Sequence, residues 1–529
     1  MLQENKIWMA QGTNPCYLLL NQANRHGIVT GASGTGKTVT LKVMAEGFSQ
    51  AGVPVFLVDV KGDVTGIAEA GADSENMQER IARFGIENWS YAGCPTRFWC
   101  VGEGQGIPMR ITVSDMGPEL LSRLLGLSDV QEGVLNIVFR VADDREMLLI
   151  DLKDLRAMLT YVSEHAKEFE MDYGRIAPQS VSAIIRSLIA VEDQGADMLF
   201  GEPALDLCDW FATAPDGRGY VNLLDATKLI QTPQTYAMFL LWMLSELFEK
   251  LPEVGDPDKP EFVFFFDEAH LLFDGMPKEL TDKVIQVVKL IRSKGVGVYF
   301  ISQSPSDIPD EVLAQLSNRI QHGLRAYTPA EQKAVRAAAA AFRENPAFDS
   351  EEAILALGTG EALVSFLDEE GRPSMVENAK ILPPQCSMQP AGQGTVAAVI
   401  DGQADLFKKY GEAVDRESAY EMIAEQKAAD ADAARMAEEQ AKLDAERAAF
   451  EKEKAEAEAK AQKAAEKEAA RIARENAKAA EKAQREADRA AERAQKAHEK
   501  QVQEFTKTIA DIGREAGKQI LRGLFGTRR

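Results

Sequence analysis

The sequence GASGTGKT at residues 31–38 constrains the fold more than any other feature of this chain. It follows the apolar run at residues 28–30 and precedes a segment of helical character, VTLKVMAEGF. Where a loop joins a strand to a helix in this way, glycines in the loop let backbone N–H groups converge on phosphate oxygens. The pattern therefore predicts a P-loop in an α/β protein, and a chance glycine-rich loop is the competing interpretation.

The P-loop motif predicts which ligand atoms its residues contact. Lys37 is expected to reach the β and γ oxygens of ATP, and the Thr38 hydroxyl is expected to bind Mg²⁺. ATP and Mg²⁺ are therefore the predicted ligands. The rest of the predicted cradle consists of Gly31, Ala32, Ser33, Gly34, Thr35, Gly36 and Val39.

A pair of carboxylates, Asp267 and Glu268, follows the apolar run FVFFF at residues 262–266. Carboxylates at the end of a buried strand can hold the metal of a nucleotide site and orient the attacking water. We expect Asp267 to bind Mg²⁺ and Glu268 to polarise water. The alternative is the start of a helix, because acidic residues favour the first turn, and one segment can serve both purposes.

Three further residues are candidates for contact with the γ-phosphate. Gln303 follows the apolar run at residues 296–302 and is a predicted polar sensor, with an ordinary turn residue as the alternative. Arg319 and Arg325 lie on or beyond the next predicted strand. A positive charge from a neighbouring subunit often accelerates γ-phosphate cleavage, whereas a surface ion pair is the simpler role for each arginine.

Asp59 ends the run PVFLVD and is followed by Lys61, Gly62 and Asp63. These charges belong to the carboxyl edge of the predicted sheet, where ligands of α/β proteins bind. Asp and Gly also form turns and caps, so both interpretations of Asp59 remain open.

Residues 1–385 alternate between β-rich and helical segments, which indicates an α/β domain. Strands that are apolar throughout predict a parallel sheet covered on both faces. Between about residues 117 and 200 only helical patterns occur, so a helical insertion into the sheet domain is predicted. The predicted strands are residues 28–30, 54–60, 262–266, 296–302, 320–326 and 362–367.

The C-terminal part has a different composition. Residues 386–411 are interpreted as a linker, and residues 412–512 as one long Ala/Glu/Lys-rich helix without proline. Met436, Leu443 and Phe450 are seven residues apart, and both a solvated single helix and a weak coiled coil are kept as alternatives. Residues 513–529 are basic and amphipathic, which fits a docking helix or a membrane-surface anchor.

Charge and targeting signals narrow the functional classes. The net charge is −23, of which about −1 falls on residues 401–529 and about −22 on residues 1–400. Indiscriminate adhesion to DNA through a basic surface is therefore not supported. The N-terminus lacks an export pattern and no apolar run is long enough to cross a membrane, so a cytoplasmic location is expected. The five cysteines are interpreted as reduced thiols, with a Cys94 and Cys100 redox pair as the alternative.

Several longer segments together resemble the bacterial HerA-like ATPases of the YjgR type, in the HerA/FtsK superfamily. They are FLVDVKGDVTGIA, VFFFDEAHLLF, KLIRSKGVGVYFISQSPSDIPDEVLAQLSNRIQHGLRAYTP and GKQILRGLFG. The resemblance implies a RecA-like ATPase core, usually a hexameric ring that binds nucleotide between subunits and translocates double-stranded DNA. It supports the roles given above to Lys37, Thr38, Asp267, Glu268 and Gln303, and it implies that Arg325 or Arg319 acts in trans.

One departure from HerA helicases bears on function. Those proteins carry a β-barrel before the P-loop, and thirty residues are too few for strands of roughly five or six residues each. The preferred hypothesis is a Mg²⁺-dependent ring ATPase that acts on DNA as a translocase or helicase-like motor. The alternative is an ATP-switched scaffold that recruits a protein partner through its C-terminal helix. A small-molecule kinase is disfavoured, because Glu268 beside Asp267 suits activation of water.

Overall fold

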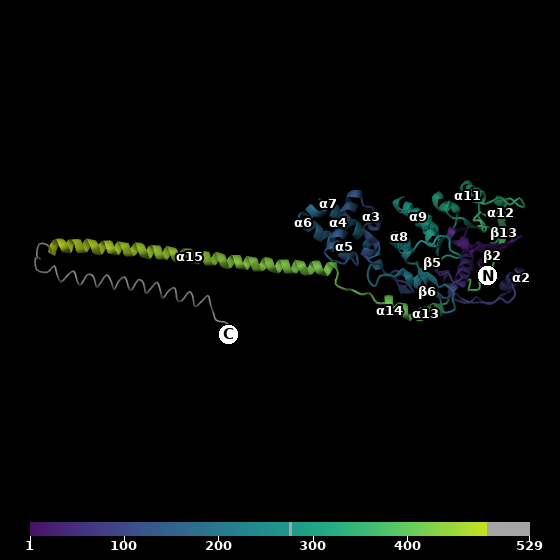
Figure 1. Ribbon diagram of the computed structural model, residues 1–529, viewed down its shortest axis with the longest axis horizontal. Coiled ribbons are helices and arrows are strands. Elements are labelled where there is room, and N and C mark those ends of the chain that lie inside the picture. The colour runs from purple at the N-terminus through teal and green to yellow at the C-terminus, as the bar shows by residue number, and fades with distance from the viewer. Residues whose placement is uncertain (274–277, 484–529) are drawn as a thin grey trace. The chain divides into compact units, whose positions relative to one another are not determined.

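The computed structural model describes residues 1–273 and 278–483 (Figure 1). The chain divides into a compact unit, Met1–Gln426, and a second unit that begins at Lys427. Among the described helices, none is both long enough and apolar enough to cross a membrane. All five cysteines are free, so Cys94 and Cys100 form no disulfide.

One mixed sheet forms the centre of the compact unit, and the described residues contribute 13 strands to it. The order across the sheet is β1-β2-β13-β12-β11-β4-β10-β9-β5-β8-β6-β7, and β3 pairs with β2. The strands are β1 (Leu2–Gln3), β2 (Lys6–Gln11), β3 (Pro15–Leu19), β4 (Gly27–Thr30), β5 (Val55–Asp59), β6 (Thr96–Cys100), β7 (Ile107–Pro108), β8 (Val221–Asp225), β9 (Phe262–Phe266), β10 (Val296–Ser302), β11 (Asn318–His322), β12 (Glu361–Ser365) and β13 (Glu377–Ile381).

The strands from β11 to β7 run parallel to one another. Thr30 of β4 lies opposite Ser302 of β10, and Phe266 of β9 lies opposite both Phe300 of β10 and Val58 of β5. The carboxyl ends of these four strands therefore meet at one edge of the sheet. Ligands of parallel α/β sheets bind at such an edge.

Helices cover both faces of the parallel strands. Residues of β9 alternate between two core clusters, one shared with α1 and the other shared with α8 and α9. Burial on both faces explains why this strand is apolar throughout, and the predicted α/β class is confirmed. The helices around the sheet are α1 (Lys37–Gln50), α2 (Glu75–Arg83), α8 (Pro233–Lys250), α9 (Lys278–Ile291), α10 (Asp310–Leu313), α11 (Pro329–Ala340) and α12 (Ser350–Ala356).

Five helices lie between β7 and β8, in the part of the chain where a helical insertion is predicted. Two of them begin at side-chain caps, because Thr112 accepts the N–H of Asp115 and Asp151 accepts the N–H of Lys153. Their inward faces pack into the same core cluster that covers the α8 and α9 face of the sheet. These helices are α3 (Val113–Leu124), α4 (Asp129–Asp144), α5 (Leu152–Glu164), α6 (Ala166–Tyr173) and α7 (Pro178–Glu192).

The antiparallel side of the sheet differs in part from the sequence-based expectation. The first strands belong to the same sheet, because Lys380 and Ile381 of β13 pair with Gln11 and Ala10 of β2. The strand predicted at residues 320–326 is Asn318–His322 instead. It ends there because the chain leaves the sheet at Gly323, whose carbonyl accepts the N–H of Ala32.

Residues 386–411, interpreted from the sequence as a linker, contain two helices, α13 (Gln393–Asp401) and α14 (Ala404–Tyr410). The fully buried Tyr410 fixes this segment, since its carbonyl accepts a hydrogen bond from Arg110 and its hydroxyl accepts the N–H of Asp206. The linker interpretation is therefore wrong for these helices: apolar side chains such as Val396 are buried in the core.

A long C-terminal helix is confirmed as α15 (Ala419–Ala483), although it begins at Ala419 rather than at residue 412 as predicted. Met436, Leu443 and Phe450 are 73%, 48% and 53% exposed in the single chain. Such exposure is expected both for a solvated helix and for a coiled-coil seam without its partner. The remainder of the predicted helix, residues 484–512, and the basic segment 513–529 lie outside the described residues.

Candidate functional site

The predicted P-loop connects the carboxyl end of β4 to the first turn of α1. Gly31 has a φ of +154°, and a Cβ there would lie 2.5 Å from the Cβ of His322. Gly36 has a φ of +115° directly before Lys37 begins the helix. Glycine is therefore required at the start of the loop by crowding and at its end by backbone conformation.

The buried side of the loop rests on strands that come later in the chain. The N–H of Ala32 donates to the carbonyl of Gly323 at 2.9 Å, and the N–H of Gly360 donates to the carbonyl of Thr35 at 2.9 Å. The outer side is open, because Ser33 and Gly34 are exposed. The backbone of the loop is thus fixed from below and accessible from outside.

His322 supports the P-loop, although no sequence motif indicated a role for it. It is fully buried; its Nδ1 donates to the carbonyl of Glu361 at 2.9 Å, and its Nε2 lies 2.8 Å from the hydroxyl of Thr40. Burial lowers the pKa of His322 to about 4, so the ring is neutral at physiological pH. The only signal in the sequence was its position within the strand predicted at residues 320–326.

The amine of Lys37 is folded into its own loop. Its Nζ donates to the carbonyls of Gly31 at 2.7 Å and Ala32 at 3.1 Å. Burial lowers the pKa of Lys37 below its ordinary value. Thr38 and Val39 follow in the first turn of α1, and both are partly buried.

Asp267 and Glu268 lie directly after β9, and their residues are only 6% and 5% exposed. Burial, followed by the charge of Glu268, raises the pKa of Asp267 to about 7. Glu268 has a φ of +48° and a ψ of +48°, in the left-handed region that side chains other than glycine rarely adopt. A short 3₁₀ turn begins right after Glu268, as the alternative prediction required, but its first turn contains no acidic residue.

The carboxylate of Glu268 has one close cationic partner. Its Oε1 accepts a charged hydrogen bond from Lys61 Nζ. Its Oε2 is buried without a hydrogen-bond partner in the described structure, and the Nδ1 of His270 lies 3.3 Å from it. Sequence reasoning missed Lys61 in this role, because it is 207 residues from Glu268 along the chain.

Asp59 organises the loop that carries Lys61. Its carboxylate accepts the N–H groups of Lys61 at 3.2 Å, Gly62 at 2.6 Å and Val64 at 3.1 Å. Burial, followed by the charge of Asp63, raises the pKa of Asp59 to about 6. Of the two interpretations left open by the sequence, the turn-forming one describes these contacts.

Gln303 and Arg325 line one pocket together with Ala32 and Ser33 of the P-loop, and its volume is about 330 Å³. Gln303 follows β10, which lies between β4 and β9 in the sheet. Arg319 is elsewhere: its guanidinium donates to the carbonyls of Leu316 and Leu313, and burial lowers its pKa. The structure therefore brings Arg325 to the P-loop, whereas Arg319 is committed to its own backbone.

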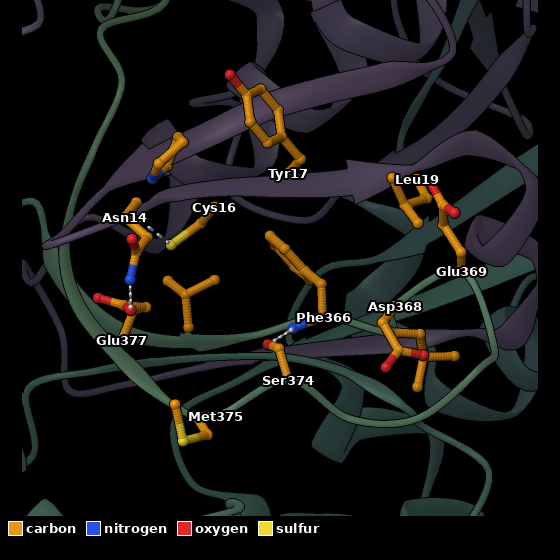
Figure 2. A pocket seen from close by; sticks show the side chains of 13 residues that line it. Asn14, Cys16, Tyr17, Leu19, Phe366, Asp368, Glu369, Ser374, Met375 and Glu377 are labelled. Carbon is orange, nitrogen blue, oxygen red and sulfur yellow. Dashed lines mark hydrogen bonds between the residues drawn. The ribbon is translucent and has the colours of Figure 1, made fainter. Parts of the chain in front are cut away.

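A separate groove of about 430 Å³ lies between β3 and the turn that joins β12 to β13 (Figure 2). Phe366 and Cys16 line its interior, while Asp368, Glu369 and Glu377 lie along it. None of the site residues predicted from the sequence lines this groove.

The residues at the P-loop fit a nucleotide with its metal. The Oδ1 of Asp63 is buried without a hydrogen-bond partner, and its Oδ2 lies 3.4 Å from the hydroxyl of Thr38. The described residues contain no group of three or more His, Cys, Asp or Glu side chains that could hold a metal alone. Mg²⁺ in nucleotide sites is bound through one or two carboxylates together with substrate phosphates, which matches this set of groups.

Comparison with known proteins gives a family match and structural similarities. The model of the family described as "Helicase HerA-like C-terminal" matches residues 4–529. No curated protein matches the sequence. The unbound bacterial conjugative coupling protein TrwBdeltaN70 is 14% identical with a TM-score of 0.47, over 74% of this chain and 92% of that one.

Two further solved structures are similar at the same level. The plasmid coupling protein TrwB in complex with ADP and Mg²⁺ is 14% identical with a TM-score of 0.46, over 72% of this chain and 89% of that one. VirB4 of Thermoanaerobacter pseudethanolicus is 15% identical with a TM-score of 0.43, over 75% of this chain and 99% of that one.

Proposed function

Because the chain belongs to the helicase HerA-like C-terminal family, we propose that it is a Mg²⁺-dependent ATPase that acts as a motor on double-stranded DNA. One observation carries the ATPase part of this proposal. The P-loop, Gln303 and the pair Asp267 and Glu268 follow three neighbouring parallel strands, β4, β10 and β9. Groups that bind phosphate, sense it and activate water thus share one edge of the sheet.

The residues of the chain divide the work as follows. The P-loop backbone and Lys37 bind the phosphates of ATP, and the amine of Lys37 exchanges the carbonyls of Gly31 and Ala32 for phosphate oxygens. Glu268 orients the attacking water and accepts its proton. Gln303, at the mouth of the pocket beside the P-loop, contacts the γ-phosphate.

Thr38 and Asp267 are the residues that would hold Mg²⁺, which neutralises charge on the phosphate oxygens when bound. Asp267 is ionised only in part near neutral pH, because burial raises its pKa to about 7. A nearby cation favours the ionised form of such a carboxylate. A bound Mg²⁺ would therefore favour the ionised form of Asp267, which is the form that binds the metal.

We also propose that the protein works as a homo-oligomer, a hexamer by family resemblance, with Arg325 as the arginine that acts in trans. Arg325 is exposed and lines the pocket beside the P-loop of its own chain, so its role in trans rests on the family resemblance alone. Arg319 is less suited, because its guanidinium already donates to two carbonyls of its own chain.

The alternative is an ATP-switched scaffold that recruits a protein partner. The net charge of −23 and the long exposed helix α15 favour it, since an acidic surface repels the DNA backbone. Deletion of residues 412–529 should then abolish oligomerisation or partner capture. Unchanged assembly and capture in that deletion variant would eliminate the scaffold function.

The test is ATP hydrolysis by the purified protein with double-stranded DNA, with single-stranded DNA and without DNA. Lys37→Ala and Glu268→Gln are the control variants. Stimulation by DNA that vanishes in both variants establishes a nucleic-acid motor. If both variants lose ATP turnover but no DNA stimulates turnover by the wild type, the result supports the ATPase function and contradicts the motor function.

A further inference from the structure

The loop after β5 reaches both halves of the nucleotide site. Asp63 lies 3.4 Å from the hydroxyl of Thr38 on one side, and Lys61 forms an ion pair with Glu268 on the other. We infer that Lys61 is a positioning residue: it holds the carboxylate of Glu268 in the orientation from which that group activates water. This inference rests on the proposed ATPase function and adds a residue to its mechanism.

Hydrogen bonds fix the backbone of the loop after β5, which carries Lys61. Three N–H groups of the loop donate to the carboxylate of Asp59, which is 1% exposed. Gly62 has a φ of +77°, which turns the chain back toward the P-loop at no steric cost. Lys61 therefore enters the site from a rigid turn, and its side chain alone adjusts to the carboxylate.

Glu268 depends on this partner more than a surface residue would. Its side chain is 6% exposed, whereas that of Lys61 is 52% exposed. A surface ion pair contributes little, but a carboxylate left unpaired in a buried site is costly. Burial alone would lower the pKa of Lys61, yet the hydrogen bond and charge of Glu268 raise it above its ordinary value.

The geometry divides the two carboxylate oxygens of Glu268 between two tasks. Lys61 occupies Oε1, whereas Oε2 makes no hydrogen bond among the described residues, although the Nδ1 of His270 lies 3.3 Å from it. An oxygen with a free lone pair can accept a hydrogen from water, whereas one paired with an ammonium group is held in place. Without Lys61, the side chain of Glu268 is free to leave this orientation.

The experiment compares Lys61→Met, Lys61→Arg and the wild-type full chain. We expect Lys61→Met to lower kcat by at least about tenfold, a part of the 10²–10⁴-fold that a positioned base supplies. KM should stay within about twofold, because phosphate binding rests on the P-loop. Lys61→Arg should recover most of the rate, since a guanidinium also donates to a carboxylate.

Lys228→Met is the matched control. Lys228 also follows a strand of the same parallel set, β8, and forms an exposed ion pair with Glu103 at 2.8 Å. This variant should hydrolyse ATP at the wild-type rate. Binding of a fluorescent ATP analogue at wild-type affinity by Lys61→Met verifies that the site is folded.

A double variant separates positioning from a structural role. In a Glu268→Gln background, Lys61→Met should cause no further loss, because Lys61 acts through Glu268. Equal kcat in Lys61→Met and wild type, or a full additive loss in the double variant, overturns the inference while leaving the ATPase intact. Turnover that survives Lys37→Ala instead overturns the proposed function itself.

Discussion

The hydroxyl of Thr38 donates a long hydrogen bond of 3.4 Å to the Oδ2 of Asp63, so the loop after β5 touches the helix that begins at the P-loop. We expect Asp63→Asn to weaken Mg²⁺ binding to the nucleotide complex by about tenfold or more, as partners of metal ligands typically contribute 10–100-fold. Titration of Mg²⁺ against a fluorescent ATP analogue measures this. Asp216→Asn, at an exposed ion pair with Arg218, is the control, and equal Mg²⁺ affinity in both variants would contradict the prediction.

Gly31→Ala should weaken nucleotide binding without unfolding the protein. Its Cβ would lie 2.5 Å from the Cβ of His322, so the loop or the strand must move. Overpacking of this kind costs about 1–3 kcal/mol, which corresponds to roughly a 5–150-fold loss of affinity if it falls on the bound state. Equilibrium binding of ATP to the wild type and to Gly31→Ala measures this loss of affinity. Gly133→Ala on α4, where a Cβ meets no atom within 4 Å, should bind as the wild type does.

Glu46 makes stability depend on pH. Burial raises its pKa to about 7, while its carboxylate accepts the N–H groups of Gln385 and Cys386. Between the unfolded value of about 4.3 and 7, the folded protein keeps a proton that the unfolded chain has lost. The free energy of unfolding should therefore fall as pH rises through this window, on the order of 1.4 kcal/mol per unit.

Urea denaturation at several values between pH 5 and pH 8 tests this dependence. Glu46→Gln stays neutral throughout, so the wild-type free energy of unfolding should decline relative to the variant as pH rises. Parallel curves for the two proteins would show that Glu46 does not hold a proton in the folded state.

Asp154 joins the helical insertion to the start of α15. It is fully buried and accepts hydrogen bonds from the Ile150 N–H at 2.9 Å, the Ser418 hydroxyl at 2.5 Å and the Tyr420 N–H at 3.1 Å. Asp154→Ala should lower the free energy of unfolding by about 3 kcal/mol, because these donors lose a charged acceptor. Chemical denaturation measures the change, and Asp172→Ala at an exposed site should shift it by less than about 0.5 kcal/mol.

Arg325 can be assigned to its own site or to a neighbouring one by mixing variants. Lys37→Ala lacks a working P-loop. Arg325→Ala should lower ATP turnover by at least about tenfold, since an arginine that acts in trans increases kcat by about 10³–10⁵-fold in other P-loop enzymes. If Arg325 acts in trans, mixed oligomers should hydrolyse ATP faster than either variant alone. Absence of rescue in oligomers shown to contain both variants would mean that Arg325 acts on the P-loop of its own chain.

The sequence predicted best the strands that are buried on both faces. The bounds of β9 and β10 agree with prediction because β9 is apolar throughout and β10 is apolar up to its last residue, Ser302. The strands β1–β3, β6–β8 and β13 were not predicted: they are short or mix polar with apolar residues, as Lys6 and Asn222 illustrate. Their pairing is decided by tertiary contact, which local patterning does not reveal.

For the candidate site, the sequence indicated groups that are contiguous along the chain. The P-loop and the pair Asp267 and Glu268 each form one motif after one strand. The contacts between motifs were not predictable, because Lys61 meets Glu268 and His322 meets Thr40 only after the sheet assembles.

The order of strands in the sheet also governs when the nucleotide site can form during synthesis. Both neighbours of β4 in the sheet, β10 and β11, are made long after it, so the P-loop strand emerges from the ribosome without a partner. At about 5–20 residues per second, the wait is on the order of tens of seconds. The nucleotide site is thus complete only after strands that are translated much later than the P-loop, and a nascent chain that ends before β10 should not retain ATP.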